Sequence, residues 1–95
     1  MNLKSRYEHR IQDLSGLNSA LKDLNKCIYD MHNTLPEILK IAQKYNGLII
    51  GLNGVESGIR ADFKANWITF TEYNKLMDRL DTIKHVVTLM ENETS

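Results

Sequence analysis

The apolar residues of this chain recur at alternating intervals of three and four positions in three separate segments. Side chains at this spacing share one face of an α-helix, and a repeat kept for many turns is typical of helices that pack at a shallow angle. In the first segment the repeat is Leu3, Tyr7, Leu14, Leu17, Leu21, Leu24, Ile28, Met31 and Leu35, and in the third it is Tyr73, Leu76, Leu80, Ile83, Val87 and Met90. In the first repeat a charged residue, Arg10, takes one of the apolar positions.

The middle segment carries two parallel rows with this rhythm. One row is bulky and the other small: Ile41, Tyr45, Leu48, Leu52, Val55 and Ile59 make the first, and Gly47, Gly51, Gly54, Gly58, Ala61 and Ala65 make the second. A glycine inside a helix costs roughly 0.5–1 kcal/mol relative to alanine, so the row needs a compensating interaction. Close packing of another helix against the small row would provide it, and we therefore predict a contact seam over 47–65.

The same stretch also permits a different interpretation. The sequence from Lys44 to Leu48 resembles a helix C-terminus, with Gly47 in the left-handed conformation. The helix predicted over 35–66 is therefore continuous, kinked, or broken near 47–54. The periodicity favours a continuous or kinked helix.

Two capped turns separate the three segments. Thr34 and Glu37, with Pro36 in the first helical turn, have the spacing of a capping box, and so do Thr69 and Glu72. The stretch 67–73 also alternates like a β-strand, but a lone strand would have no pairing partner. We predict a helix N-terminus there, with Ile68 and Tyr73 as the apolar residues that flank the cap.

These patterns predict an all-α fold. We expect one domain over 1–95, built as a three-helix antiparallel bundle or as a helical hairpin with an added third helix, with coiled-coil-like packing. The expected helices span about 3–33, about 35–66 and about 70–91, followed by a polar tail over 91–95.

The charge and the cysteine content limit the functional classes. Twelve basic and twelve acidic residues give a formal net charge of zero, which disfavours a dedicated nucleic-acid binder. The one cysteine, Cys27, cannot form an internal disulfide, which fits a reducing compartment. No leader peptide and no apolar run long enough to span a membrane is evident, so we expect the cytoplasm, or the host cytoplasm if the protein is phage-encoded.

The sequence predicts no catalytic, cofactor-binding or metal-binding residues, and hence no enzyme. Cys27 and His32 diverge on a helix, and His9 and His85 lie far from them in sequence. A three-helix enzyme of this size needs several cations that point into the bundle, and only Arg10 replaces an apolar seam residue. The alternating charges Arg60, Asp62 and Lys64 are interpreted as surface charges.

We therefore expect a non-enzymatic protein–protein interaction module, either an assembly subunit or a small regulator that occupies a partner's surface. Its narrow apolar seams and zero net charge predict a homodimer or a hetero-assembly. Phe63, Trp67 and Phe70 form an aromatic cluster at the second turn, and an exposed Trp67 would mark the partner side. In general shape, though in no specific motif, the chain resembles small assembly subunits and phage-encoded regulators or inhibitors.

The competing hypothesis is a small DNA-binding regulator. The residues at about 38–60 loosely match a helix-turn-helix, with a turn at Gly47. Its would-be recognition helix offers only Arg60 and Lys64 as cations, which are few for phosphate contacts.

Overall fold

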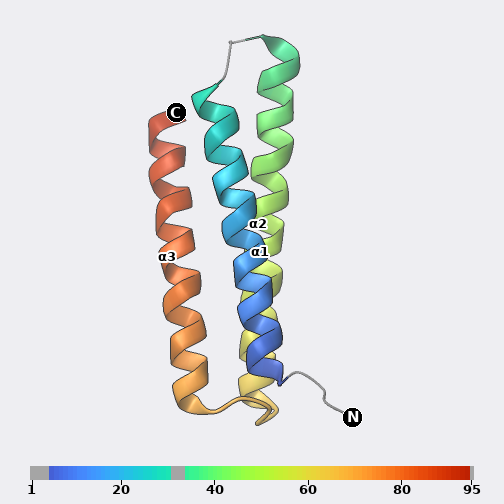
Figure 1. The fold of residues 1–95 in the computed structure, drawn as a ribbon, viewed down its shortest axis with the longest axis vertical. Coiled ribbons are helices and arrows are strands. Elements are labelled where there is room, and N and C mark those ends of the chain that lie inside the picture. Colours follow the sequence, from blue (N-terminus) through green and yellow to red (C-terminus); the bar gives the residue numbers. More distant parts are fainter. Residues whose placement is uncertain (1–4, 31–33, 95) are drawn as a thin grey trace.

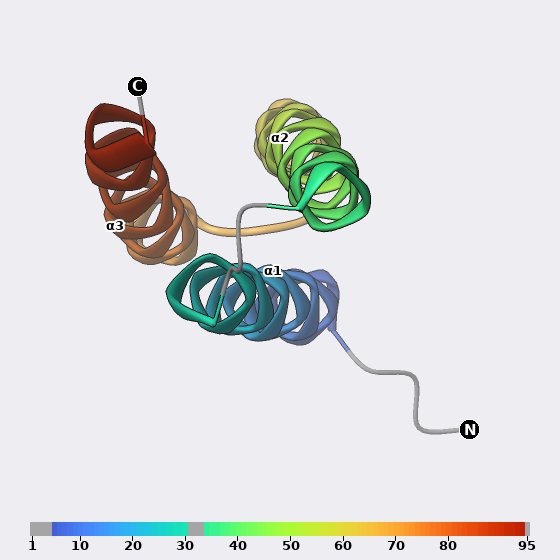
Figure 2. The ribbon, with the colours of Figure 1, turned by 90° about the horizontal axis from the view of Figure 1, so that it is seen from above.

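The computed structural model describes residues 5–30 and 34–94, which fold into three long helices. These are α1 (Arg6–Tyr29), α2 (Leu35–Lys64) and α3 (Phe70–Thr94), and they run up, down and up (Figure 1). Each helix contacts both others, and seen from above they occupy the corners of a triangle (Figure 2). The predicted all-α three-helix bundle is confirmed. Residues 67–73 contain no strand.

The core is built from the predicted apolar repeats. The buried apolar residues are Leu14, Leu17, Leu21 and Leu24 of α1, Leu48, Leu52 and Ile59 of α2, Ile68 before α3, and Leu76, Leu80, Ile83, Val87 and Met90 of α3. Partly buried members of the same repeats, such as Tyr45 and Val55, pack against this cluster. The bundle is thin, with extents of 49 × 29 × 16 Å, because one layer of side chains fills the space between the helices.

Helix α1 as described is shorter than predicted, and α3 begins at the predicted residue but extends further. Helix α1 begins after Ser5, whose hydroxyl accepts a hydrogen bond from the Glu8 N–H (3.1 Å), and Asp30 is its C-cap. Leu3 and Met31 lie outside the described residues. Leu35 opens α2 instead of closing the first repeat, and its side chain is exposed. Helix α3 continues to Thr94, through most of the stretch expected to be a tail.

Helix α2 is continuous through its glycines. It runs unbroken from Leu35 to Lys64, and no glycine in the described chain has a positive φ. Gly47 is therefore not a helix stop, and the row of apolar residues on α2 stays in register on both sides of it. The turn that a helix-turn-helix at 38–60 requires is absent, so the prediction of that motif is wrong.

One of the two predicted capping boxes forms. The Thr69 N–H donates to Glu72 Oε1 (2.8 Å), and the Glu72 N–H donates to Thr69 Oγ1 (3.0 Å), as expected. Thr34 occupies the N-cap of α2 with an extended backbone, but its side chain makes no capping bond. The predicted capping bond of the Thr34 hydroxyl is therefore wrong, whereas the predicted positions of Thr34 at the N-cap and of Pro36 in the first turn, where it needs no partner for a backbone N–H, are confirmed.

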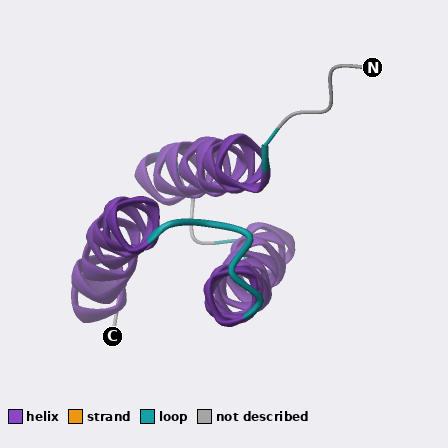
Figure 3. Ribbon diagram, turned by 90° about the horizontal axis from the view of Figure 1, so that it is seen from below, coloured by secondary structure: helices purple, strands orange, loops and turns teal. Residues whose placement is uncertain are grey.

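The end of α2 is a Schellman motif built on an asparagine. Asn66 has a φ of 63°, the Trp67 N–H donates to the Asp62 carbonyl (2.9 Å), and the Asn66 N–H donates to the Phe63 carbonyl (3.0 Å). These bonds satisfy carbonyls that the helix leaves open, and they turn the chain toward α3. Figure 3 shows the resulting loop crossing beneath the bundle.

We expect Asn66→Ala to lower the free energy of unfolding by about 1 kcal/mol, because the left-handed conformation costs an ordinary L-residue about 1–2 kcal/mol. Asn66→Gly should leave stability unchanged or raise it, since glycine adopts this conformation freely. Urea denaturation followed by circular dichroism measures both changes. Equal destabilisation by alanine and glycine would mean that the asparagine side chain, and not the backbone conformation, matters.

Candidate functional site

A buried ion pair joins the two polar residues that interrupt the apolar rows. Asp62 is 1% exposed and continues the α2 row one step beyond Ile59. Arg10, at the irregular position of α1, donates from Nε to Asp62 Oδ2 (2.7 Å) and from Nη2 to Oδ1 (3.4 Å). Its third nitrogen, Nη1, bonds the exposed Asp13 (3.1 Å). The Asp62 carboxylate, through its hydrogen bond above all, raises the pKa of Arg10 above its usual value.

The interpretation of Asp62 as a surface charge is therefore wrong. The missed signal was positional: Asp62 falls three residues after Ile59 in the apolar row, as Arg10 falls three after Tyr7 in the first repeat. Two polar residues of opposite sign in two packed rows are expected to meet, because an unpaired buried charge is strongly unfavourable.

Two of the α2 glycines make room for α1. A Cβ added at Gly51 would lie 2.9 Å from Leu17 Cδ2, and one added at Gly58 would overlap the Arg10 guanidinium. Leu17 and Arg10 therefore lie directly against the α2 backbone. This half of the predicted seam is used within the chain, and Gly58 gives Arg10 its path to Asp62.

The other small residues of the predicted seam face away from the bundle. Gly47 and Gly54 have no atom within 4 Å of an added Cβ, and Ala61 and Ala65 are exposed. They accompany Ile50, a large apolar side chain that is 72% exposed and was not predicted as a site residue. A helix turns slightly less than twice in seven residues, so Gly51 and Gly58 form one row and Gly47, Gly54 and Ala61 a second, adjacent row.

We define the outer face of α2 as the row Gly47, Ile50, Gly54, Ser57 and Ala61. The neighbouring exposed residues Gln43, Asn46 and Asn53 are also uncharged. The row itself carries no charged side chain over about four turns of helix, and the exposed cations Lys40, Arg60 and Lys64 border it. One exposed isoleucine stands in its middle, between two glycines.

The predicted aromatic cluster at the second turn forms in part. Phe63 stacks on Tyr73 with ring centroids 4.5 Å apart and meets Phe70 at 6.1 Å, while Phe70 itself is mostly exposed. Trp67 lies instead under the Arg6 guanidinium, 4.6 Å from the ring centroid, and is 58% exposed. Arg6 also approaches Asp62 Oδ1 (3.5 Å), so it links the indole to the buried carboxylate.

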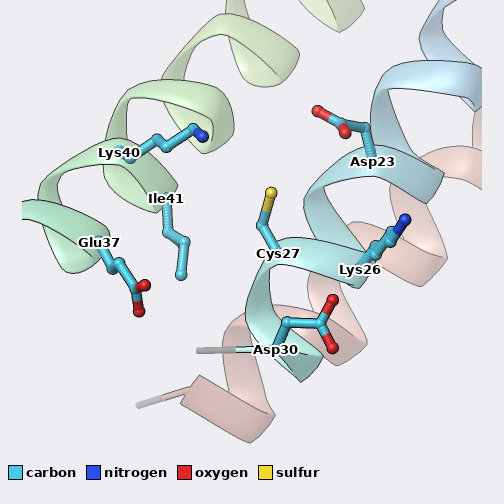
Figure 4. A pocket seen from close by; sticks show the side chains of 7 residues that line it. All are labelled: Asp23, Lys26, Cys27, Asp30, Glu37, Lys40 and Ile41. Atoms are coloured by element: carbon cyan, nitrogen blue, oxygen red, sulfur yellow. The ribbon is translucent and has the colours of Figure 1, made fainter. Parts of the chain in front are cut away.

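A polar depression lies between the end of α1 and the start of α2 (Figure 4). Asp23, Asp30 and Glu37 line it around Cys27, but their carboxylates point in different directions. Within the described residues no three His, Cys, Asp or Glu side chains are close enough to hold a metal ion. His32 lies outside those residues. No described helix combines the length and the apolar content that crossing a membrane requires.

The sequence matches no known family model and no characterised protein, and the structure matches no solved structure.

We expect Arg10→Met to lower the free energy of unfolding by about 3 kcal/mol, because it leaves Asp62 buried without its main partner. Asp62→Leu should cost less, since Arg10 is 18% exposed and keeps Asp13 as a partner. The double variant should return to within about 1 kcal/mol of the wild type, because a well-packed apolar pair can replace a buried ion pair. Urea denaturation tests this cycle, with Asp13→Asn as the exposed control, and additive losses would contradict it.

Gly58→Ala should destabilise the wild-type protein by roughly 1–3 kcal/mol, because the added methyl displaces the Arg10 guanidinium from its bonds to Asp62. In the double variant, which has no guanidinium there, the same substitution should stabilise by about 0.5–1 kcal/mol. The same denaturation measurements reveal this reversal of sign. A Gly58→Ala effect that is equal in both backgrounds would show that the glycine does not serve the ion pair.

Proposed function

We propose that this chain is a non-enzymatic protein-interaction module that self-associates through the outer face of α2. The observation that carries the proposal is Ile50, a 72% exposed isoleucine in the middle of a charge-free face, flanked by glycines that contact nothing in their own chain. A single exposed apolar side chain is common on a protein surface, so the proposal depends on the position of Ile50 between two glycines that leave space beside it.

The glycines on this face support a contact with another helix. Gly47 and Gly54 each cost roughly 0.5–1 kcal/mol relative to alanine in a helix. Gly51 and Gly58 carry the same cost but accommodate Leu17 and Arg10. For Gly47 and Gly54, a contact with a second chain would provide the compensation.

The row is complementary to itself. When two copies of α2 pack antiparallel about a two-fold axis, residue i meets residue j and j meets i. Centring the axis near Leu52 places Ile50 of each copy over Gly54 of the other, and Gly47 over Ser57. Each isoleucine then enters a gap that a glycine provides.

The rest of the structure is compatible with this use. The face opposite the row on α2 is committed to the core through Leu48, Leu52 and Ile59, so α2 is held rigidly while its outer face is free. Zero net charge lowers the electrostatic repulsion between copies. The absence of a turn in α2 keeps the row straight enough for a long contact.

Gly54→Leu should weaken self-association by at least about tenfold in Kd, or 1.4 kcal/mol, because leucine fills the gap that receives Ile50 of the other copy. Gly16→Leu is the matched control, since Gly16 of α1 is also exposed with no atom within 4 Å of an added Cβ. Sedimentation equilibrium over micromolar to millimolar concentrations measures both variants. A wild-type protein that stays monomeric over this range, or equal effects of the two leucines, would refute self-association through this face.

A further inference from the structure

The three helix–helix interfaces differ in how polar groups are used. Salt bridges join α1 to α2, through Arg10–Asp62 and through Lys44–Asp23 (2.5 Å). Another joins α2 to α3, where Lys84 pairs with Glu56 and its hydrogen bond lowers the pKa of that carboxyl. Along the α1–α3 interface, Lys22 and Arg79 form no salt bridge within the described part of the chain.

Two adjoining depressions follow the α1–α3 interface. The lower has a volume of about 340 Å³ and is lined by Leu14, Ser15, Asn18, Arg79, Thr82 and Ile83. The upper has a volume of about 280 Å³ and is lined by Leu21, Lys22, Asn25, Val86, Leu89 and Met90. We call the two together the α1–α3 groove. Its floor is apolar, and it lies on the opposite side of α1 from α2.

The walls of the groove have the geometry that receives a helix. One wall is the α1 row Ser15, Asn18, Lys22 and Asn25, and the other is the α3 row Arg79, Thr82, Val86 and Leu89. Residues within each row are three, four and three positions apart. Because α1 and α3 run in the same direction, each residue of the α1 row has a counterpart at the same step of the α3 row. Side chains of a third helix fit between two such rows as they do in a bundle, over about three turns.

The chemistry of the lining selects the kind of helix. Lys22 and Arg79 are the charged residues of the lining, and it contains no carboxylate. Val86 and Leu89 are 36% and 48% exposed, so apolar surface is available at the upper end. From this combination we propose that the groove docks an amphipathic helix of a partner protein that carries acidic residues beside its apolar row.

In this arrangement the apolar side chains of the partner helix cover Val86 and Leu89. A carboxylate at the lower end pairs with Arg79, and another beside the apolar row pairs with Lys22. Complementary charge determines the partner and its orientation, while apolar burial supplies the affinity. The proposal is independent of self-association, because the outer face of α2 is uncharged and cannot supply the acidic residues.

The probes are two synthetic helical peptides of roughly 18 residues, or five turns. Both carry leucines at alternating three and four spacing, and they differ only in having glutamates or lysines beside this row. Binding to the full-length protein is measured by fluorescence anisotropy, and amide chemical shifts locate it. We expect the glutamate peptide to bind at least about tenfold more tightly than the lysine peptide, with shifts confined to the groove.

Charge reversal makes the test specific. In Arg79→Glu combined with Lys22→Glu, the preference should reverse in favour of the lysine peptide. Lys40→Glu is the control, because it also replaces a lysine by a glutamate but lies at the depression between α1 and α2, away from the groove. This variant should still bind the glutamate peptide more tightly than the lysine peptide. Sedimentation equilibrium should show no effect of the groove variants on self-association.

The proposal would be overturned if neither peptide binds, if both bind equally, or if the chemical-shift changes map to the outer face of α2. A fourth outcome would replace it: if duplex DNA displaces the glutamate peptide and its binding also depends on Arg79 and Lys22, then the groove reads phosphate and not a protein helix.

Discussion

The pairing of Arg10 with Asp62 fixes how this bundle is assembled. Apolar rows alone let two helices slide past each other by a turn with little change in buried area, because leucine replaces leucine. A buried carboxylate with two hydrogen bonds from one guanidinium does not tolerate such a shift, since sliding would leave a charge unpaired in the core. The ion pair therefore selects the register of α1 on α2, even where its net contribution to stability is small.

This register determines the roles of the glycines. With Arg10 beside Asp62, the α2 backbone at Gly58 must accommodate a guanidinium, and one heptad earlier Gly51 accommodates Leu17. The neighbouring row is turned away from α1 and remains open. The contact between Arg10 and Asp62 thus divides the small residues of α2 into a row that packs against α1 and a row that is exposed.

Most of the fold could be predicted from the sequence, because the apolar spacing encodes helices and their buried faces directly. The predictions that were wrong concern local interactions of polar residues. Thr34 has the residue type and spacing of a cap without forming the bond, whereas Thr69 forms it, so the signature depends on the approach of the chain as well as on its residues. Asn66 in the left-handed position gave no glycine signal, and the end of α2 was for that reason only approximately placed.

The candidate site was predicted less completely, for a reason that lies in the periodicity itself. Helical spacing predicts that the small residues lie on one side of α2. It does not show which of the two adjacent rows, that of Gly51 and Gly58 or that of Gly47 and Gly54, faces the neighbouring helix. Only the position of α1 distinguishes Gly58 from Gly54, and that position depends on Asp62. The alternation of charges in Arg60, Asp62 and Lys64 led to the wrong prediction that Asp62 is a surface residue.

The distribution of charge gives the three sides of the bundle different capacities. On the α1–α2 and α2–α3 sides, Arg10, Lys44 and Lys84 each pair with a carboxylate of the same chain. On the α1–α3 side Lys22 and Arg79 have no such partner among the described residues, and the central row of the outer face of α2 carries no charge. We propose that this uncharged row, with its gaps for large side chains, receives an identical copy. An unbalanced basic groove disfavours an identical copy and requires a different, acidic surface. The two proposed contacts therefore suit different occupants, and they do not compete for the same surface, because the helices present the two faces in different directions.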